Sequence, residues 1–404
     1  MLSKTDIVRS DFKVLIITGM HPTRENPAAG IFITRMMQKL QQYGVQYDLI
    51  SFCKKENWDL KLLKRILNLP LNEEKEIIRY GGVQYNFIPI NVSIMDYRKG
   101  IDKLMVDAVK KQINLSKYDL LHAHWVYPHG YIATRLKNET GLPCIVTAHG
   151  SDIHTNPLKR KRSKSLVIST LHAADKVIFT SNRLYEIAKE LGYQNNNRVI
   201  MPMGVETNKF FPLAKENVKD KLGLKTLNLK YIGYIGALRR IKGADRLPEI
   251  FKQVARRYNS VQFIVIGDGE VGPEIKKKCV RYNLNILFKG TVSPEEMPFW
   301  LNVLDALVVP SRNEGFPCII SEAQACGCPV VGSNAGGIPE AVGDGGLIVD
   351  DGPNFEEEFS FAVIQMLEKP PPREQIRGQA LKFDWDLIIR KHIDLYEDML
   401  KQHH

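Results

Sequence analysis

The chain has 404 residues, of which 44% are hydrophobic and 25% charged. This length is too great for one ordinary hydrophobic core and suits two α/β domains, and the composition is that of a soluble globular protein. No run of about 18 apolar residues occurs, so no membrane-spanning helix is expected. The six scattered cysteines form no zinc-type pair of pairs, and the N-terminal residues lack an apolar stretch of signal-peptide length. Together these features predict reduced thiols and a cytoplasmic protein.

The net charge of +11 is concentrated in the first half of the chain. Residues 1–205 contain 30 Lys and Arg against 18 Asp and Glu, a balance of +12, whereas the rest of the chain has a balance of −1. Such an excess predicts attraction to an acidic partner, such as an anionic membrane surface or a phosphorylated acceptor. A basic surface that serves only solubility fits the charge equally well. Nucleic acid is not expected, because the basic runs lack interleaved aromatic residues.

Short β-branched apolar runs alternate with helical patterns along the whole chain. In the first half, strands are expected at 14–18, 47–52, 83–88, 119–123, 144–148 and 177–181, with helices at 31–43 and 105–113. The pattern then restarts, with strands expected at 231–236, 263–266, 286–288, 306–309, 330–332 and 347–349, and helices at 248–257 and 321–326. Alternation of this kind predicts βαβ units, and hence a parallel sheet in each of two Rossmann-like domains.

The domain boundary is expected near 202–204, so that residues 1–205 form an N-terminal domain and residues 206–383 a C-terminal one. Apolar residues at helical spacing then predict a last helix within 384–404, which is expected to pack back across both domains. Open α/β sheets bind ligands at the carboxyl ends of their strands. Functional residues are therefore expected directly after strands, around a cleft between the domains.

The clearest candidate site lies between Glu314 and Glu322, after the apolar run 306–310. Gly315 allows the backbone to turn and to approach a ligand closely, and Pro317 suits the first turn of a helix. The amino end of such a helix attracts phosphate through its N–H groups and its dipole. A carboxylate accepts two hydroxyl hydrogen bonds at once, so each glutamate suits a sugar or ribose diol. Taken alone, the two glutamates would more simply be surface residues around a loop.

This Glu-x7-Glu spacing, with Gly-Phe-Pro inside it, resembles the retaining glycosyltransferases of family 4, which have the GT-B fold. Other segments resemble the same family and keep its order: 122–125 (HAHW), 128–130 (PHG), 148–152 (AHGSD), 203–206 (MGVE), 236–243 (GALRRIKG) and 336–340 (GGIPE). The resemblance covers essentially the whole chain. It implies an acceptor-binding N-terminal domain and a nucleotide-sugar-binding C-terminal domain.

The resemblance also implies roles for individual residues in the C-terminal domain. Glu322 would hold the ribose hydroxyls of the nucleotide, and Glu314 would hold the donor sugar. Lys242 would neutralise the diphosphate leaving group, and Glu314 and Lys242 would both act in catalysis. The loop between the glutamates would complete the donor site with Gly315, Phe316, Pro317 and Cys318. The backbone N–H groups of Gly315, Phe316 and Cys318 would reach the sugar.

In the N-terminal domain, the resemblance places His149 beside the transferring sugar and assigns it to catalysis. Gly30 would let the acceptor and the donor phosphate approach the backbone. One departure concerns the phosphate loop, where the family usually has arginine directly after the glycine and this chain has Ala237. Arg239 or Arg240 must then supply the positive charge, and Arg239 is slightly favoured. The competing interpretations are a structural histidine for His149 and a solvated surface lysine for Lys242.

Three other patterns resemble functional motifs, and each has a simpler explanation. The segment 267–272 (GDGEVG) fits a dinucleotide fingerprint, but no acidic residue follows the next strand, so it is interpreted as a turn. Asp384 and Asp386 resemble a metal-binding DxD pair, but Asp384 is expected to cap the last helix. His122 and His124 alternate at a strand end and are expected to pack in the core or line the cleft. No metal is predicted.

The sequence thus predicts a metal-independent hexosyltransferase that uses a UDP- or GDP-sugar as co-substrate and has no permanently bound cofactor. The segment 26–32 (NPAAGIF) resembles family members that build bacterial surface polysaccharides on a lipid carrier. The basic segments 60–67 and 159–162 add an expected peripheral contact with the inner face of a membrane. Two alternatives stay open: a nucleotide-sugar epimerase of the same fold and, with less support, a nicotinamide-dependent oxidoreductase.

Overall fold

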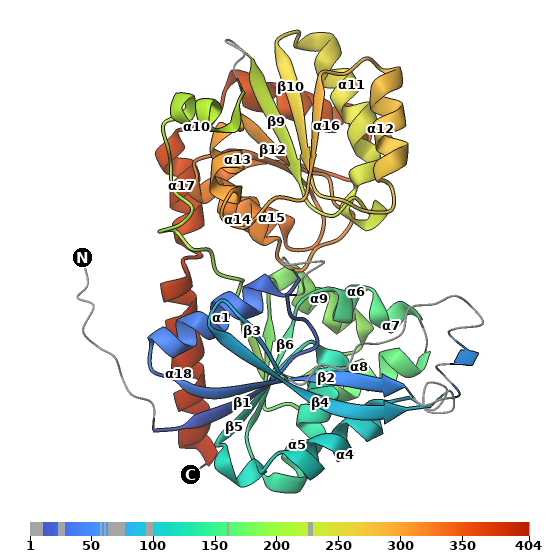
Figure 1. Cartoon of the computed structure of the whole chain (residues 1–404), viewed down its shortest axis with the longest axis vertical. Coiled ribbons are helices and arrows are strands. Elements are labelled where there is room, and N and C mark those ends of the chain that lie inside the picture. The colour runs from blue at the N-terminus through green and yellow to red at the C-terminus, as the bar shows by residue number, and fades with distance from the viewer. Residues whose placement is uncertain are drawn as a thin grey trace. The chain divides into compact units, whose positions relative to one another are not determined.

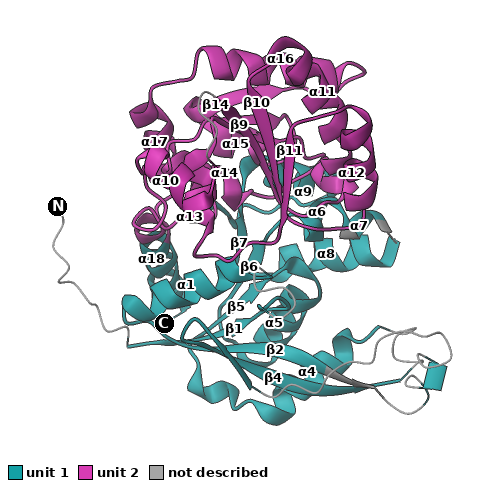
Figure 2. Ribbon diagram, turned by 45° about the horizontal axis from the view of Figure 1, so that its top comes forward, with its two compact units in different colours: residues 1–201, 389–404 teal, residues 202–388 magenta. Residues whose placement is uncertain are grey.

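The structure is a computed structural model that describes residues 11–22, 29–56, 59, 62–63, 77–93, 100–159, 161–224 and 229–403. The chain forms two compact units (Figure 2). Unit 1 comprises residues 1–201 and 389–404, and unit 2 comprises residues 202–388. The division between them therefore falls at the start of the expected segment 202–204. All six cysteines are thiols, and only Cys318 is not buried.

Unit 1 contains an eight-stranded sheet with the strand order β3-β4-β2-β1-β5-β6-β7-β8. Its strands are β1 Lys13–Ile17, β2 Gln46–Glu56, β3 Ile77–Tyr80, β4 Val83–Val92, β5 Leu120–His124, β6 Cys144–Ala148, β7 Lys176–Phe179 and β8 Arg198–Ile200. The central strands are apolar and almost wholly buried, as expected for parallel strands with both faces covered.

Helices cover both faces of this sheet (Figure 1). The helical segments of unit 1 before the last helix are α1 Ile31–Gln42, α4 Asp102–Gln112, η1 Leu115–Lys117, η2 Val126–Gly130, α5 Tyr131–Thr140, α6 Ser151–His154, α7 Asn156–Lys159, α8 Lys161–Ala173 and α9 Asn182–Leu191. Side chains from α4, α5, α8 and α9 form one continuous apolar core with the strands.

Two edge strands of unit 1 were not predicted from the sequence, and one of them is antiparallel. β3 pairs antiparallel with β4, so the expectation of a purely parallel sheet was wrong at this edge. The two strands are joined by Gly81 and Gly82, which have φ values of 56° and 79°. Two glycines in this conformation suit a tight hairpin turn. β8 is only three residues long, which is too short to stand out as an apolar run.

Unit 2 contains a six-stranded, wholly parallel sheet with the order β11-β10-β9-β12-β13-β14. Its strands are β9 Lys230–Ile235, β10 Val261–Ile266, β11 Ile286–Gly290, β12 Ala306–Val309, β13 Val330–Ser333 and β14 Gly346–Val349. Its helical segments are α10 Lys215–Leu222, η3 Arg240–Lys242, η4 Ala244–Arg246, α11 Leu247–Arg257, α12 Gly272–Arg281, α13 Met297–Val303, α14 Cys318–Ala325, α15 Ile338–Val342, η5 Gly343–Gly345, α16 Phe355–Glu368 and α17 Arg373–Leu381. The apolar faces of α11, α12 and α16 pack together on one side of the sheet, so this unit is a second α/β sandwich, as the sequence indicated.

The last helix, α18 Trp385–His403, contributes residues to both units. Asp384 caps it: the Asp384 backbone oxygen accepts hydrogen bonds from Leu387 and Ile388 at 3.1 and 3.0 Å, and its carboxylate accepts the Asp386 N–H at 2.7 Å. The Asp384 carboxylate also accepts the Thr207 hydroxyl. These contacts give Asp384 the capping role that the sequence predicted for it. The ring of Trp385 is buried over Gly204.

At the carboxyl edge of the unit 2 sheet, neighbouring loops touch backbone to backbone. A Cβ atom added to Gly243, after β9, would lie 1.9 Å from the carbonyl oxygen of Pro310, after β12. A Cβ atom on Gly336, after β13, would lie 1.9 Å from the carbonyl oxygen of Glu314. No side chain fits at such distances, so these loops are positioned by direct contact between their backbones.

Alanine at position 243 should destabilise unit 2 strongly, by about 3 kcal/mol or more, because the added methyl group overlaps a backbone oxygen. Gly223 provides a matched control, because it also has a left-handed backbone (φ 71°) but its Cβ would meet nothing within 4 Å. Gly223→Ala should therefore lower the free energy of unfolding by only about 1 kcal/mol, the penalty for a left-handed backbone at a residue with a side chain. Urea unfolding of both variants measures the difference, and equal losses would contradict the backbone contact.

Candidate active site

The residues that the sequence assigned to a donor site lie on loops that follow adjacent strands of unit 2. β9 and β12 pair in parallel, so the loops after Ile235 and Val309 leave the sheet at the same edge. This is the edge at which open α/β sheets bind ligands. Lys242 lies on the first loop and Glu314 on the second.

The Lys242 ammonium forms an ion pair with the Glu314 carboxylate. The Nζ atom donates to Oε1 at 2.8 Å and to Oε2 at 2.6 Å, and the Ser311 hydroxyl donates to Oε1 at 2.9 Å. The side chain of Glu314 is only 11% exposed, whereas that of Lys242 is 39% exposed. The pair thus places an accessible ammonium group beside a carboxylate that is held by two donors. An ammonium group suits a phosphate, and a carboxylate suits sugar hydroxyls.

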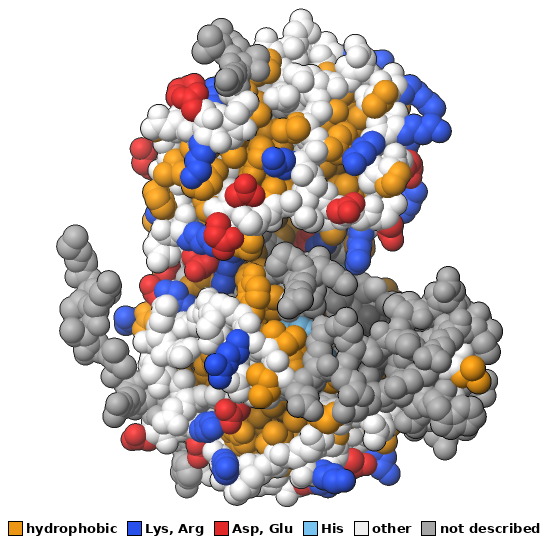
Figure 3. Space-filling model, in the orientation of Figure 1, with side chains coloured by type: hydrophobic (Ala, Val, Ile, Leu, Met, Phe, Trp, Pro, Cys, Tyr) orange, Lys and Arg blue, Asp and Glu red, His pale blue; other side chains and the backbone are white. Residues whose placement is uncertain are grey.

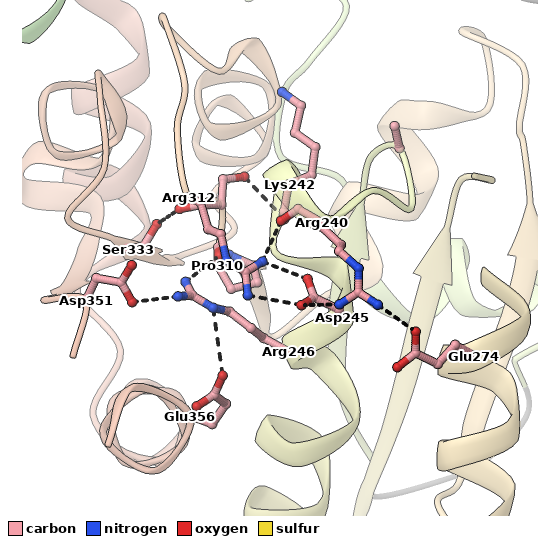
Figure 4. Close-up of polar contacts among 12 residues, drawn as sticks. Arg240, Lys242, Asp245, Arg246, Glu274, Pro310, Arg312, Ser333, Asp351 and Glu356 are labelled. Atoms are coloured by element: carbon pink, nitrogen blue, oxygen red, sulfur yellow. Dashed lines mark hydrogen bonds and ion pairs between the residues drawn. The ribbon is translucent and has the colours of Figure 1, made fainter. Parts of the chain in front are cut away.

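The two candidate arginines of the phosphate loop differ in their contacts (Figure 4). Arg240 pairs with Asp245 at 3.5 Å and with Glu274 at 3.1 Å. Arg312, which was not among the predicted site residues, donates two hydrogen bonds to the Asp245 carboxylate, of 2.7 and 3.0 Å. In Figure 4 the side chain of Lys242 extends away from these pairs. Arg239 is exposed and makes no side-chain hydrogen bond or ion pair with any described residue.

The second glutamate lies on α14, which begins directly after this loop. Pro317 is the residue before the first turn rather than within it, and its carbonyl oxygen accepts the Ile320 N–H at 3.0 Å. Glu322 is 8% exposed and lies on the second turn. Phe316 packs edge-on against Phe383 with the ring centroids 5.0 Å apart, which fixes the loop that leads into the helix. Gly315 is buried and Cys318 half-buried at the start of this helix.

In unit 1, His149 follows β6 and lies among aromatic rings. Its ring centroid is 4.6 Å from that of Trp125 and 5.1 Å from that of Phe32, on α1. The contact between Phe32 and His149 shows that the start of α1, which Gly30 precedes with φ 64°, lies close to the His149 loop. Trp125 has φ 72°, an uncommon backbone conformation for a residue with a side chain and one often found at functional sites.

Asp152 organises the loop that carries His149. Its carboxylate accepts the backbone N–H groups of Gly150 at 2.8 Å, Val126 at 2.9 Å and His149 at 3.1 Å. The side chain is fully buried, which raises its pKa, while these hydrogen bonds oppose the increase. The aspartate of the AHGSD segment therefore holds the loop in place, while His149 keeps part of its surface exposed.

Burial keeps three histidines of unit 1 neutral. Loss of solvation is the main cause in each case: it lowers the pKa of His149 to about 3, with His392 nearby adding to the shift, and it lowers the pKa values of His122 and His124 well below 6.5. The sequence predicted that His122 and His124 pack in the core or line the cleft. The structure buries both, but it also places the Nδ1 atom of His124 3.0 Å from the Nε2 atom of His149.

Acidification should therefore destabilise unit 1. The native state binds fewer protons than the unfolded chain below about pH 6.5, so stability is complete above that pH and falls as the pH drops toward the native pKa values. Each such histidine contributes a slope of up to about 1.4 kcal/mol per pH unit. Urea unfolding between pH 7.5 and pH 5 measures this loss, and His124→Phe should reduce the slope. A midpoint that does not change with pH would contradict the neutral histidines.

The glycine-rich segment 267–272 supports the loop that follows β9. The Leu238 N–H donates to the Asp268 oxygen at 2.9 Å, and the Leu238 oxygen accepts from Val271 at 3.1 Å. The segment thus holds the backbone of the loop that carries Lys242. Among the described residues, no cluster of three or more His, Cys, Asp or Glu side chains is arranged to hold a metal ion.

The basic segments expected at a membrane are only partly visible. Most of the segment 60–67 and residue 160 lie outside the described residues. On the face shown in Figure 3, Lys and Arg side chains are interspersed with acidic ones over the described surface. No described helix is both long enough and apolar enough to cross a lipid bilayer.

Comparison with known proteins finds a glycosyltransferase family match for each unit. Residues 29–209 match the glycosyltransferase family 4 model, and residues 215–383 match that of glycosyl transferases group 1. The chain is 26% identical to a putative teichuronic acid biosynthesis glycosyltransferase, TuaC of Bacillus subtilis, over 82% of this chain and 83% of that protein.

Solved structures share the fold over nearly the whole chain. Sucrose-phosphate synthase from Thermosynechococcus elongatus superposes with a TM-score of 0.74 at 19% identity, covering 97% of this chain and 100% of that one. HepE of Anabaena, solved in complex with UDP-glucose, superposes with a TM-score of 0.69 at 16% identity, covering 96% and 100%. With two Rossmann-like units and family matches to both, the chain belongs to the family 4 glycosyltransferases of the GT-B fold.

Proposed function

We propose that this enzyme transfers a hexose-type sugar from a nucleoside-diphosphate sugar to an acceptor, with retention of the anomeric configuration and without a metal ion. The observation that carries this proposal is the Lys242–Glu314 pair, held at 2.6–2.8 Å at the carboxyl edge of the unit 2 sheet. A bound donor can use both members, because its diphosphate attracts the ammonium and its sugar hydroxyls donate to the carboxylate. Glu322, on the adjacent helix, is assigned to the ribose hydroxyls.

The chemistry needs stabilisation of the leaving group more than it needs a nucleophile on the protein. Cleavage of the bond between the anomeric carbon and the phosphate oxygen leaves negative charge on the diphosphate. The acceptor oxygen forms the new bond to that carbon and gives its proton to the departing diphosphate. Preorganised cations stabilise such charge without a metal ion. Lys242 supplies one cation. Arg239 is the better candidate for a second, because Arg240 is already paired with two carboxylates.

The identities of the donor and the acceptor are inferred from relatives. HepE binds UDP and UDP-glucose, which supports a UDP-sugar ahead of a GDP-sugar. The name of the Bacillus relative refers to teichuronic acid biosynthesis, which supports a bacterial surface-polysaccharide precursor as acceptor, either free or lipid-linked. The charge balance of +12 in residues 1–205 suits an acidic acceptor or a peripheral position at the inner face of a membrane.

Thermal unfolding in the presence of UDP, GDP, ADP and NADH tests the donor site first. A ligand at about a hundred times its dissociation constant adds about 2.7 kcal/mol of stability, so one nucleoside diphosphate should raise the melting temperature clearly. NMR of the product formed from the matching α-linked donor should then show an α-linked sugar. Stabilisation by NADH alone would favour an oxidoreductase. Conversion of the nucleotide sugar to its epimer without an acceptor would favour an epimerase; the names of the relatives support neither.

A further inference from the structure

The hydrogen bond between His124 and His149 constrains where each ring carries its proton. His124 is the last residue of β5, and His149 follows the adjacent strand β6, with which β5 pairs in parallel. The Nδ1 atom of His124 lies 3.0 Å from the Nε2 atom of His149. When both rings are neutral, one proton must lie between these two nitrogens, so one ring donates and the other accepts.

The surroundings of His124 determine which ring donates. Its side chain is 1% exposed, and its Nε2 atom is buried without a hydrogen-bond partner among the described residues. If the proton of His124 were on Nε2, a buried N–H group would go unpaired, which proteins rarely accept. With the proton on Nδ1, the N–H group of His124 is satisfied by His149.

His149 must then accept through Nε2 and carry its own proton on Nδ1. That nitrogen makes no hydrogen bond with any residue that the structure describes, and His149 keeps part of its surface exposed, unlike His122 and His124. We propose that His124 is a positioning residue, which fixes His149 as the Nδ1–H tautomer so that it presents a neutral N–H donor, rather than a basic lone pair, to an oxygen atom of the bound substrate. The part that concerns the substrate rests on the proposed function.

The ring of His124 packs against a neighbouring ring that is itself held in place. The ring of His122 lies beside it with centroids 4.5 Å apart, and His122 is held at both nitrogens, by Thr147 and by Tyr396 of α18, each at 2.7 Å. Asp152 fixes the backbone of His149, and the ring of His149 packs against those of Trp125 and Phe32. Packing at both ends of the hydrogen bond therefore favours the ring orientations that form it.

NMR of the full-length protein with ¹⁵N-labelled histidines tests the tautomer directly. In the substrate-free protein at pH 7, the His149 signal, identified by its loss in His149→Asn, should show a protonated Nδ1 and a bare Nε2. His124→Phe should move this signal toward the Nε2–H form. His172→Asn, which alters a histidine on α8, is the matched control and should leave it in place. A protonated Nε2 on His149 in the wild-type protein would overturn the proposal.

Three substitutions at position 124 separate positioning from packing. The amide of asparagine lies at the distance of Nδ1 from the backbone, whereas the amide of glutamine lies at that of Nε2. With UDP-glucose as the probe, His124→Gln and His124→Phe should lower kcat for release of UDP by about 10- to 100-fold, the range found for groups that orient a functional histidine. His124→Asn should recover most of that loss.

Equal losses in the Asn and Gln variants, at equal melting temperatures, would mean that His124 only fills space and would overturn the positioning role. The NMR experiment needs neither donor nor acceptor. If the tautomer is as stated but no nucleotide sugar is turned over, the proposed function fails while the assignment of the protons in this pair stands.

Discussion

Replacement of Lys242 by alanine should lower kcat/KM for sugar transfer by about 10²- to 10³-fold, the usual cost of removing one group that stabilises developing negative charge. The loss should appear mainly in kcat, because the charge on the leaving diphosphate is greatest in the transition state. Steady-state kinetics with the donor that stabilises the protein measures both constants.

Lys252→Ala is the matched control for this variant. Lys252 also pairs with a glutamate in unit 2, Glu249 at 3.2 Å, but it lies on α11. Its removal should leave turnover within about twofold, since an exposed ion pair contributes little to stability. Lys242→Ala also leaves the Glu314 carboxylate with Ser311 as a remaining donor, so a modest loss of stability is expected and must be measured separately. Turnover equal to that of the wild type in Lys242→Ala would refute the assignment of the donor site.

Glu322→Gln should weaken binding of the nucleoside diphosphate by about 10- to 100-fold. The amide keeps the size of the side chain but removes the negative charge, and hydrogen bonds to a charged group contribute about 1.5–3 kcal/mol. Calorimetric titration with UDP or GDP, whichever stabilises the protein, gives the dissociation constant. Because the nucleotide alone is titrated, the result does not depend on the acceptor.

Glu358→Gln serves as the control for Glu322→Gln, because Glu358 lies in the exposed first turn of α16 in the same unit. Its affinity for the nucleotide should match that of the wild type. If both variants bind equally well, Glu322 supports α14 without contacting the ribose. If Glu322→Gln loses affinity for the free nucleoside as well as for the diphosphate, the lost contact lies on the nucleoside, as proposed.

The strands and the site loops could be predicted because their signals are local. Parallel strands covered on both faces read as short apolar runs, and each candidate loop follows such a run directly. The edge strand β3 was not predicted, because it is partly exposed along its whole length and forms no buried apolar run. Its local signal is the glycine pair that turns it into β4.

The pairings within the site could not be predicted, because they join residues far apart in sequence. Lys242 and Glu314 are 72 positions apart, and His124 and His149 are 25 positions apart. The sequence also favoured Arg239 over Arg240 only slightly. The contact that distinguishes Arg240 from Arg239 is its ion pair with Glu274, on α12, and no local sequence pattern predicts it.

The backbone contacts at Gly243 and Gly336 affect how this enzyme could be adapted to new donors. These loops touch through main-chain atoms, and a Cβ atom added to either glycine would lie 1.9 Å from a carbonyl oxygen of the neighbouring loop. The spacing of the loops therefore cannot be adjusted gradually by changing side-chain size. A library of point substitutions should therefore give null variants at these glycines and neutral ones at exposed positions outside the site, such as Glu358. Variants with altered donor preference should come from exchanging whole loops together. The loops of the proposed donor site should therefore change together and not one residue at a time. Natural relatives with different donors should differ by coordinated replacement of these loop segments.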